Sequence, residues 1–191
     1  MGAYLLGSIP FALLICKPFG IDPRKEGSGN LGATNVARLL GKKWGFLTLV
    51  GDLGKALLPV ALAKYLLRNE PYYYWWLSGV GFAAFLGHLF PVYLRFRGGK
   101  GVASATGILL LLCPWAVAAS FPLFLAAVTL SGYVSVGSLL ASATAPIWIY
   151  LFCRHTPYLL LASLMAVFIW LKHRENLKRL LKGEERSWRR R

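Results

Sequence analysis

Apolar residues run along this chain in long blocks, separated by short polar segments that are rich in glycine and basic residues. A helix needs about 20 mostly apolar residues to cross the hydrocarbon core of a bilayer. A lipid-exposed span has to be helical, because hydrocarbon offers no partner for free backbone groups. The blocks predict an all-α, polytopic integral membrane protein with a single domain over residues 1–191. Its seven short transmembrane helices are expected at residues 2–20, 44–67, 72–91, 102–114, 115–132, 134–152 and 158–172.

The fourth and fifth blocks form one apolar stretch that we expect to be broken. Residues 102–131 are too long for one straight helix, and Pro114 and Pro122 should each interrupt it. We therefore predict two helices that meet at Pro114. The first block lacks a basic leader, so we interpret it as the first span and not as a cleaved signal peptide.

Basic residues gather on one side of these spans. The segments after spans one and three and the C-terminal tail together hold 18 of the 22 Lys and Arg residues. Because positively charged loops remain in the cytoplasm, the N-terminus should lie outside and the C-terminus inside. The tail, at about residues 173–191, reads as a basic amphipathic segment that meets anionic membrane lipids.

Composition narrows the function classes. The formal net charge is +15, but 57% of residues are hydrophobic, so the anionic partner is a membrane surface and not a nucleic acid. The three cysteines, Cys16, Cys113 and Cys153, lie in or near apolar segments, and their spacing fits neither a zinc site nor a disulfide framework. We expect them only to fill space.

Three polar segments depart from a plain bundle, and the first covers residues 27–38. Its glycines let the backbone turn tightly, and successive N–H groups in such turns form anion-binding nests. A flexible linker is the alternative, but ordered Asn, Thr and Arg residues favour a phosphate site. The candidate contacts are Ser28, Gly29, Asn30, Gly32, Thr34, Asn35 and Arg38.

The second segment places Lys100 between Gly98, Gly99 and Gly101 at the predicted start of span four. A helix N-terminus carries partial positive charge and free N–H groups, so this pattern favours an anion site over an ordinary basic loop. His88, near the end of span three, is either a ligand or a satisfied interfacial residue.

The third segment covers residues 173–181. At 100° per residue, His173 and Asn176 share a face with Leu177 and Leu180, and the charged residues take the opposite face. Polar groups on an apolar face need partners, which favours a ligand role over a simple membrane-surface helix.

Two weaker signals lie elsewhere. Asp52 and Lys55 are ionisable residues inside span two, which makes them functional candidates, although their spacing also permits a mutual ion pair. Ser131, Ser135 and Ser138 lie around the turn between spans five and six, where small residues also serve helix packing.

These segments resemble the acyl-phosphate-dependent glycerol-3-phosphate acyltransferases of bacteria, the PlsY family. The likeness covers nearly the whole chain. It is carried by Gly7-Ser8-Ile9-Pro10, residues 27–38, Gly51-Asp52 with Lys55, residues 87–91, residues 98–102, the serine turn, and His173-Arg174-Glu175-Asn176 with Gly183-Glu184. Ser104 stands where threonine is more usual, which keeps the hydroxyl.

The resemblance implies an enzyme of the cytoplasmic (inner) membrane with its active site at the cytoplasmic face. It would transfer a fatty acyl group from acyl phosphate to the 1-hydroxyl of glycerol 3-phosphate, giving lysophosphatidic acid and inorganic phosphate in phospholipid synthesis. No metal or cofactor is implied. The pathway partners would be an acyl-phosphate-producing enzyme upstream and a second acyltransferase downstream.

The resemblance also implies roles for single residues. The acyl-phosphate headgroup would contact residues of the 27–38 segment (Ser28, Gly29, Asn30, Gly32, Thr34 and Asn35) together with Gly98 and Gly99. Glycerol 3-phosphate would be held by Arg38, Lys100, His173 and Asn176, with Ser138 nearby. His88, Asp52 and Lys55 would support the site. The proton acceptor is His173, His88 or the substrate's own phosphate, and a site poor in carboxylates favours the phosphate.

A transporter or channel for a phosphate-bearing anion is the alternative function, because interrupted helices with cationic centres suit ion pathways. The polar segments, however, gather on one predicted face and not at the membrane midplane, which favours the enzyme.

Overall fold

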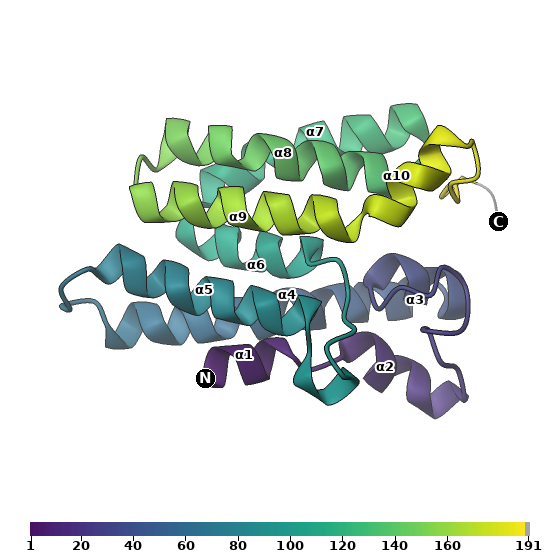
Figure 1. The fold of residues 1–191 in the computed structure, drawn as a ribbon, viewed down its shortest axis with the longest axis horizontal. Coiled ribbons are helices and arrows are strands. Elements are labelled where there is room, and N and C mark those ends of the chain that lie inside the picture. Colours follow the sequence, from purple (N-terminus) through teal and green to yellow (C-terminus); the bar gives the residue numbers. More distant parts are fainter. Residues whose placement is uncertain (190–191) are drawn as a thin grey trace. The chain divides into compact units, whose positions relative to one another are not determined.

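The computed structural model describes residues 1–189, and the regular structure in this range is entirely helical (Figure 1). The chain divides into two compact units. The first spans Met1–Leu111, and the second begins at Leu112. All-helical architecture was predicted, and the structure confirms it for the described residues.

In the first unit, helices α1 and α2 together pack against the long helix α4, and α1 also packs against α5. Glycine allows one of these close approaches, because a Cβ on Gly7 would collide with the backbone of Ala84 in α5. The elements are α1 (Gly2–Gly7), α2 (Phe11–Cys16), η1 (Lys17–Phe19), α3 (Ala33–Leu40), α4 (Lys42–Leu66), α5 (Tyr73–Leu89), η2 (Val92–Leu94) and α6 (Val102–Leu112).

The second unit is built on a hairpin of α7 (Pro114–Ser131) and α8 (Val134–Phe152), and α9 (Thr156–Lys172) packs on α8. A bend of 54° separates α9 from the short helix α10 (Arg174–Leu181). The segment after α10 returns to the α7–α8 turn, where the Ser187 hydroxyl and the Trp188 backbone N–H both donate to the Gly132 carbonyl. This end of the unit therefore gathers the hairpin turn, α10 and the tail.

Five stretches of the described chain are long and apolar enough to cross a membrane, and the bent pair α9–α10 makes a sixth. Helix α6 is apolar but has only 11 residues. A polytopic helical protein is thus confirmed, whereas the seventh span and the direction of the termini remain predictions.

The interruptions of the apolar blocks differ in part from those predicted. The expected break at Pro114 is confirmed, since α6 ends at Leu112 and α7 begins at Pro114. The expected break at Pro122 is wrong: α7 continues through it. A proline in a membrane helix forfeits one N–H bond, but neighbouring groups can satisfy the freed carbonyl. The first block breaks instead between α1 and α2, where Pro10 lies.

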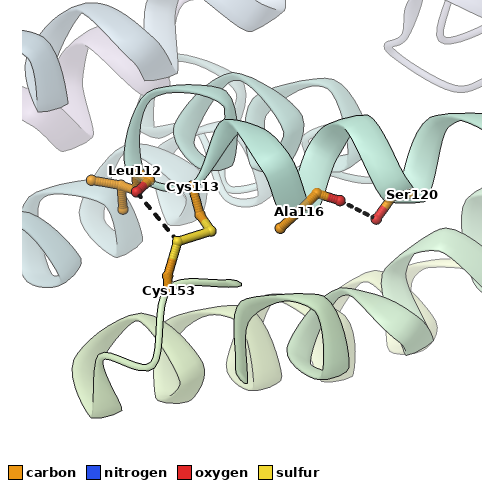
Figure 2. The surroundings of a disulfide bond; sticks show 5 residues. All are labelled: Leu112, Cys113, Ala116, Ser120 and Cys153. Carbon is orange, nitrogen blue, oxygen red and sulfur yellow. Dashed lines mark hydrogen bonds between the residues drawn. A yellow bond between two sulfur atoms is a disulfide. The ribbon is translucent and has the colours of Figure 1, made fainter. Parts of the chain in front are cut away.

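The prediction that the cysteines only fill space is wrong for two of them. Cys113, at the N-terminal end of α7, and Cys153, just after α8, form a disulfide (Figure 2). Their Cα atoms are 6.2 Å apart although 40 residues separate them in sequence, which the spacing alone could not reveal. The bond joins the two helices of the hairpin at the end opposite their turn. Cys16 is buried and free.

We predict that this disulfide exists in living cells, because the fold holds the two cysteines within bonding distance, with Cα atoms 6.2 Å apart. Alkylating thiols before lysis should leave Cys113 and Cys153 joined. Reducing the bond should lower the free energy of unfolding by about 2–4 kcal/mol, measured as a lower unfolding temperature in detergent. The Cys113→Ser, Cys153→Ser double variant is the control and should not respond to reductant. A pair that is alkylated in intact cells would contradict the prediction.

Candidate functional site

The loop before α3 owes its shape to glycines and to one buried asparagine. Gly27 and Gly29 have φ angles of 61° and 70°, a region in which other residues are strained. The Asn35 side chain accepts the Ser28 N–H at 2.7 Å and donates to the carbonyls of Pro23 (3.0 Å) and Glu26 (3.2 Å). Asn35 therefore holds the loop from inside, and the headgroup contact predicted for it stays a prediction.

The second half of the predicted loop is a helix, α3, which the sequence analysis missed. Gly32 is its N-cap residue in an extended conformation, and its carbonyl accepts the N–H groups of Asn35 and Val36. The first backbone N–H groups of a helix have no intrahelical partner and favour anions. Thr34 lies in this first turn and is partly exposed, and Arg38 is exposed further along. The missed signal was the amphipathic run bounded by Gly32 and Gly41.

The second polar segment is a tight turn pressed against the end of α5. The backbone N–H groups of Gly98 and Gly99 donate to the carbonyls of Leu89 and His88, at 3.2 and 3.1 Å. Any larger residue at Gly99 would collide with the His88 ring. Gly101 (φ 87°) then starts α6, because its carbonyl accepts the Ala105 N–H. Lys100 is thus fixed between a rigid glycine turn and a helix N-terminus.

The structure brings these two segments together within the first unit. A Cβ on Gly99 would lie 2.7 Å from the Leu31 carbonyl oxygen, so the two backbones are in close contact. Leu31, Gly98 and Gly99 also line one small cavity of about 10 Å³. Two glycine-shaped backbone turns, each leading into a helix N-terminus, therefore lie next to each other.

Beneath the turns lies a buried ionic cluster. Lys55 Nζ is 2.7 Å from Asp52 Oδ1, so the mutual ion pair that the sequence spacing permitted is formed. The same ammonium donates to the Ile9 carbonyl at 2.8 Å, and Asp52 Oδ1 lies 3.5 Å from His88 Nδ1. Ser104, in α6, donates to the Asp52 carbonyl at 3.1 Å. All four side chains are buried.

In the second unit, His173 and Asn176 face inward as the helical periodicity predicted, with exposed fractions of 3% and 6%. His173 occupies the bend between α9 and α10, and its Nδ1 contacts the Ile169 carbonyl at 2.8 Å. Because a carbonyl only accepts, Nδ1 carries the proton, which leaves Nε2 as the acceptor in the neutral ring.

Glu185 organises this end of the unit, and the sequence analysis overlooked it. Its carboxylate accepts hydrogen bonds from Ser135 (2.8 Å), Asn176 (2.6 Å) and Arg179 (2.8 Å). Burial on its own raises the pKa of Glu185, but these hydrogen bonds and the Arg179 charge outweigh it and bring the pKa below the usual value. The carboxylate is therefore ionised at neutral pH. The adjacent acids Glu184 and Glu185 near the end of a basic tail were the available signal.

Of the three serines around the α7–α8 turn, Ser131, Ser135 and Ser138, only Ser135 bonds to Glu185. Ser135 contacts Glu185, and buried Ser138 donates to the Val134 carbonyl at 3.0 Å, which leaves its oxygen able to accept. Ser131 is exposed, and its hydroxyl donates to the Ala127 carbonyl. Within residues 1–189, no three His, Cys, Asp or Glu side chains converge as a metal site requires.

Comparisons with known proteins agree on one family. Residues 1–183 match the family profile described as glycerol-3-phosphate acyltransferase. A glycerol-3-phosphate acyltransferase of Desulfotalea psychrophila is 52% identical over 97% of this chain and 94% of its own length. One from Trichlorobacter lovleyi is 51% identical over 96% of this chain and 93% of its own.

Two crystal structures of PlsY (YgiH), an integral membrane glycerol 3-phosphate acyltransferase, are similar to this chain at 39% identity. The glycerol 3-phosphate form has a TM-score of 0.91 and is matched over 97% of this chain and 92% of that one. The lysophosphatidic acid form has a TM-score of 0.89, with 97% and 91% matched. With profile, sequence and fold in agreement over nearly its whole length, the chain belongs to the glycerol-3-phosphate acyltransferase family.

Proposed function

We propose that this protein transfers a fatty acyl group from acyl phosphate to the 1-hydroxyl of glycerol 3-phosphate, releasing lysophosphatidic acid and inorganic phosphate. The family supports acylation of glycerol 3-phosphate by a membrane acyltransferase. The observation that carries the finer proposal is the pair of adjoining glycine turns, at residues 27–32 and 98–101, each of which leads into a helix N-terminus.

The acyl-phosphate donor fits the chemistry of these turns. An acyl phosphate is already an activated mixed anhydride, so the enzyme needs no covalent intermediate. It needs donors for the phosphate, donors for the oxyanion that forms at the acyl carbon, and a place for the hydroxyl proton. In the transfer, the carbonyl carbon–phosphate oxygen bond breaks, the glycerol oxygen forms the new ester bond, and the departing phosphate takes the proton.

For the first unit, we assign the acyl-phosphate headgroup to the two turns. Its contacts would be Ser28, Asn30, Gly32 and Thr34, while Gly29, Gly98 and Gly99 shape the turns, because their N–H groups are bonded to carbonyls of the protein. Asn35 is instead a positioning residue, because its amide holds the loop. Lys100 and Arg38 supply the positive charge for the phosphate of glycerol 3-phosphate, and arginine's planar fork suits such an anion.

For the second unit, we propose contacts to glycerol 3-phosphate through His173 and Asn176, with Ser138 as an accepting neighbour. Glu185 binds the Asn176 amide nitrogen, so it fixes which way that amide points. When the His173 ring is neutral, its Nε2 is the nitrogen that accepts from a substrate hydroxyl. His173 would therefore orient the hydroxyl while the substrate phosphate takes the proton.

We further propose that the enzyme is a bacterial inner-membrane protein with seven spans and a cytoplasmic active face. Two independent features support this orientation. Most Lys and Arg residues lie on the polar-segment side. The Cys113–Cys153 disulfide lies at the end of the α7–α8 hairpin away from that side, as expected if this end faces an oxidising exterior. Alkylation of the pair in intact cells would remove the second support.

Both units would serve one functional domain, since the family profile runs from residue 1 to 183. The reaction itself requires no metal or cofactor. Its donor must come from an enzyme that makes acyl phosphates, and its product suits a second acyltransferase.

Purified protein should release phosphate only when acyl phosphate and glycerol 3-phosphate are both present, with one lysophosphatidic acid formed per phosphate. Palmitoyl phosphate, palmitoyl-CoA and palmitoyl carrier protein would be compared at equal concentration. Turnover with palmitoyl phosphate and with neither thioester supports the proposal. Equal or faster turnover with either thioester would contradict it, and phosphate flux in liposomes without ester formation would instead favour a transporter.

Lys100→Ala should reduce kcat/KM about 100-fold or more, because it removes a cation assigned to the phosphate of glycerol 3-phosphate, and a misplaced substrate reacts slowly. Arg97→Ala is the matched control, since Arg97 is exposed in the same segment, and it should retain most activity. The unfolding temperature would be measured for both variants. Near-normal turnover of a folded Lys100→Ala protein would reject the assignment.

Asn176→Ala should raise the KM for glycerol 3-phosphate about tenfold, the loss expected for one hydrogen bond, while the KM for acyl phosphate changes little. Lys178→Ala, on the exposed face of the same helix, should leave both constants unchanged. Equal increases for both substrates in the Asn176 variant would undo the division of contacts.

A further inference from the structure

Three ionisable side chains are buried in the first unit without being needed as substrate contacts. Asp52 and Lys55 belong to α4 and His88 to α5, with exposed fractions of 2%, 6% and 6%. Burying charges costs several kcal/mol per ion, which pairing only partly returns. Hydrophobic residues would bind these helices together equally well, so the charges call for a further reason.

The cluster connects four parts of the unit. Lys55 donates to the Ile9 carbonyl in the break between α1 and α2, where the helical ladder is interrupted ahead of Pro10. Lys55 also pairs with Asp52, and the same Asp52 oxygen faces His88 Nδ1. A single carboxylate oxygen thus lies between the Lys55 ammonium at 2.7 Å and the His88 Nδ1 at 3.5 Å.

His88 in turn holds the glycine turn from two directions. Its carbonyl accepts the Gly99 N–H, and the Nε2 side of its ring lies so close to Gly99 that no Cβ fits between them. The Leu31 carbonyl closes in on Gly99 from the other segment. Rotating the His88 ring would therefore move Gly99, and with it the neighbouring Lys100, relative to the 27–32 turn.

We infer that Asp52 and His88 are positioning residues that set the shape of the phosphate-binding turn at Gly98–Lys100. Asp52 fixes the His88 ring through Nδ1, Lys55 compensates the buried carboxylate and anchors it to the Ile9 carbonyl, and the ring sets Gly99. The inference rests on the proposed function, because it takes this turn to be a phosphate site. It differs from a plain structural ion pair, which would stabilise the helices without affecting anion affinity.

Two variants test the idea by direct binding of radiolabelled inorganic phosphate to the purified full-length protein. His88→Asn keeps an amide able to face Asp52 but removes the ring from Gly99. Asp52→Asn keeps the shape but loses the charge that orients the ring. Ser78→Ala is the control, because Ser78 is a buried polar residue of the same helix α5.

Both variants should bind phosphate about tenfold or more weakly per folded molecule, the scale of one orienting hydrogen bond. Their unfolding temperatures should remain close to that of Ser78→Ala. If Asp52→Asn does not fold, His88→Asn alone decides the question. Phosphate affinity equal to that of the control in a folded His88→Asn protein would overturn the inference.

Turnover with palmitoyl phosphate, measured on the same samples, separates this inference from the proposed function. If the variants bind phosphate more weakly but the wild-type protein does not use acyl phosphate, the donor proposal is wrong and the positioning role stands. Normal phosphate binding in the variants, with wild-type use of acyl phosphate, would sink the positioning role alone.

Discussion

Inside a bilayer, no water is available to bond a backbone group that its helix leaves free, and this constraint governs where the chain can bend. The break between α1 and α2 shows how it is met. There the Ile9 carbonyl accepts hydrogen bonds from the Phe11 N–H and from the Lys55 ammonium, which is itself paired with Asp52. These contacts stabilise a helix break that would be costly in lipid. His88, which contacts Asp52 and accepts the Gly99 N–H, connects the break to the end of α5 and to the glycine turn.

The same constraint explains why the chemistry lies in short turns at helix ends. The backbone of the glycine turns is held by the protein, with Gly98 and Gly99 bonded to the end of α5 and Ser28 bonded to Asn35. What the turns leave for a ligand are the N–H groups that start α3 and α6. Anion affinity thus arises from the way the helices begin, and the cations Arg38 and Lys100 add charge to a geometry set by the backbone.

The sequence predicted what depends on local periodicity and missed what depends on distant partners. Apolar blocks located the long helices, Pro114 located a break, and the three-residue spacing of Asp52 and Lys55 permitted their ion pair. Helical angles also placed His173 and Asn176 on the buried face. The glycines that flank α3, however, made this short helix look like a loop. Pro122 was expected to break its helix, but α7 continues through it.

Long-range pairings were beyond such an analysis. The disulfide joins residues 40 positions apart, and Glu185 meets Ser135 across 50 positions. The hydrogen bonds from Asn35 to the Pro23 and Glu26 carbonyls were equally out of reach, because only the fold shows that its amide faces the loop interior.

The most direct test of the account is a crystal structure of this protein with a non-hydrolysable acyl phosphonate bound. The account predicts that the phosphonate oxygens lie within hydrogen-bond distance of the N–H groups that start α3 and α6. A phosphonate seated away from both glycine turns, or at the disulfide end of the α7–α8 hairpin, would contradict it.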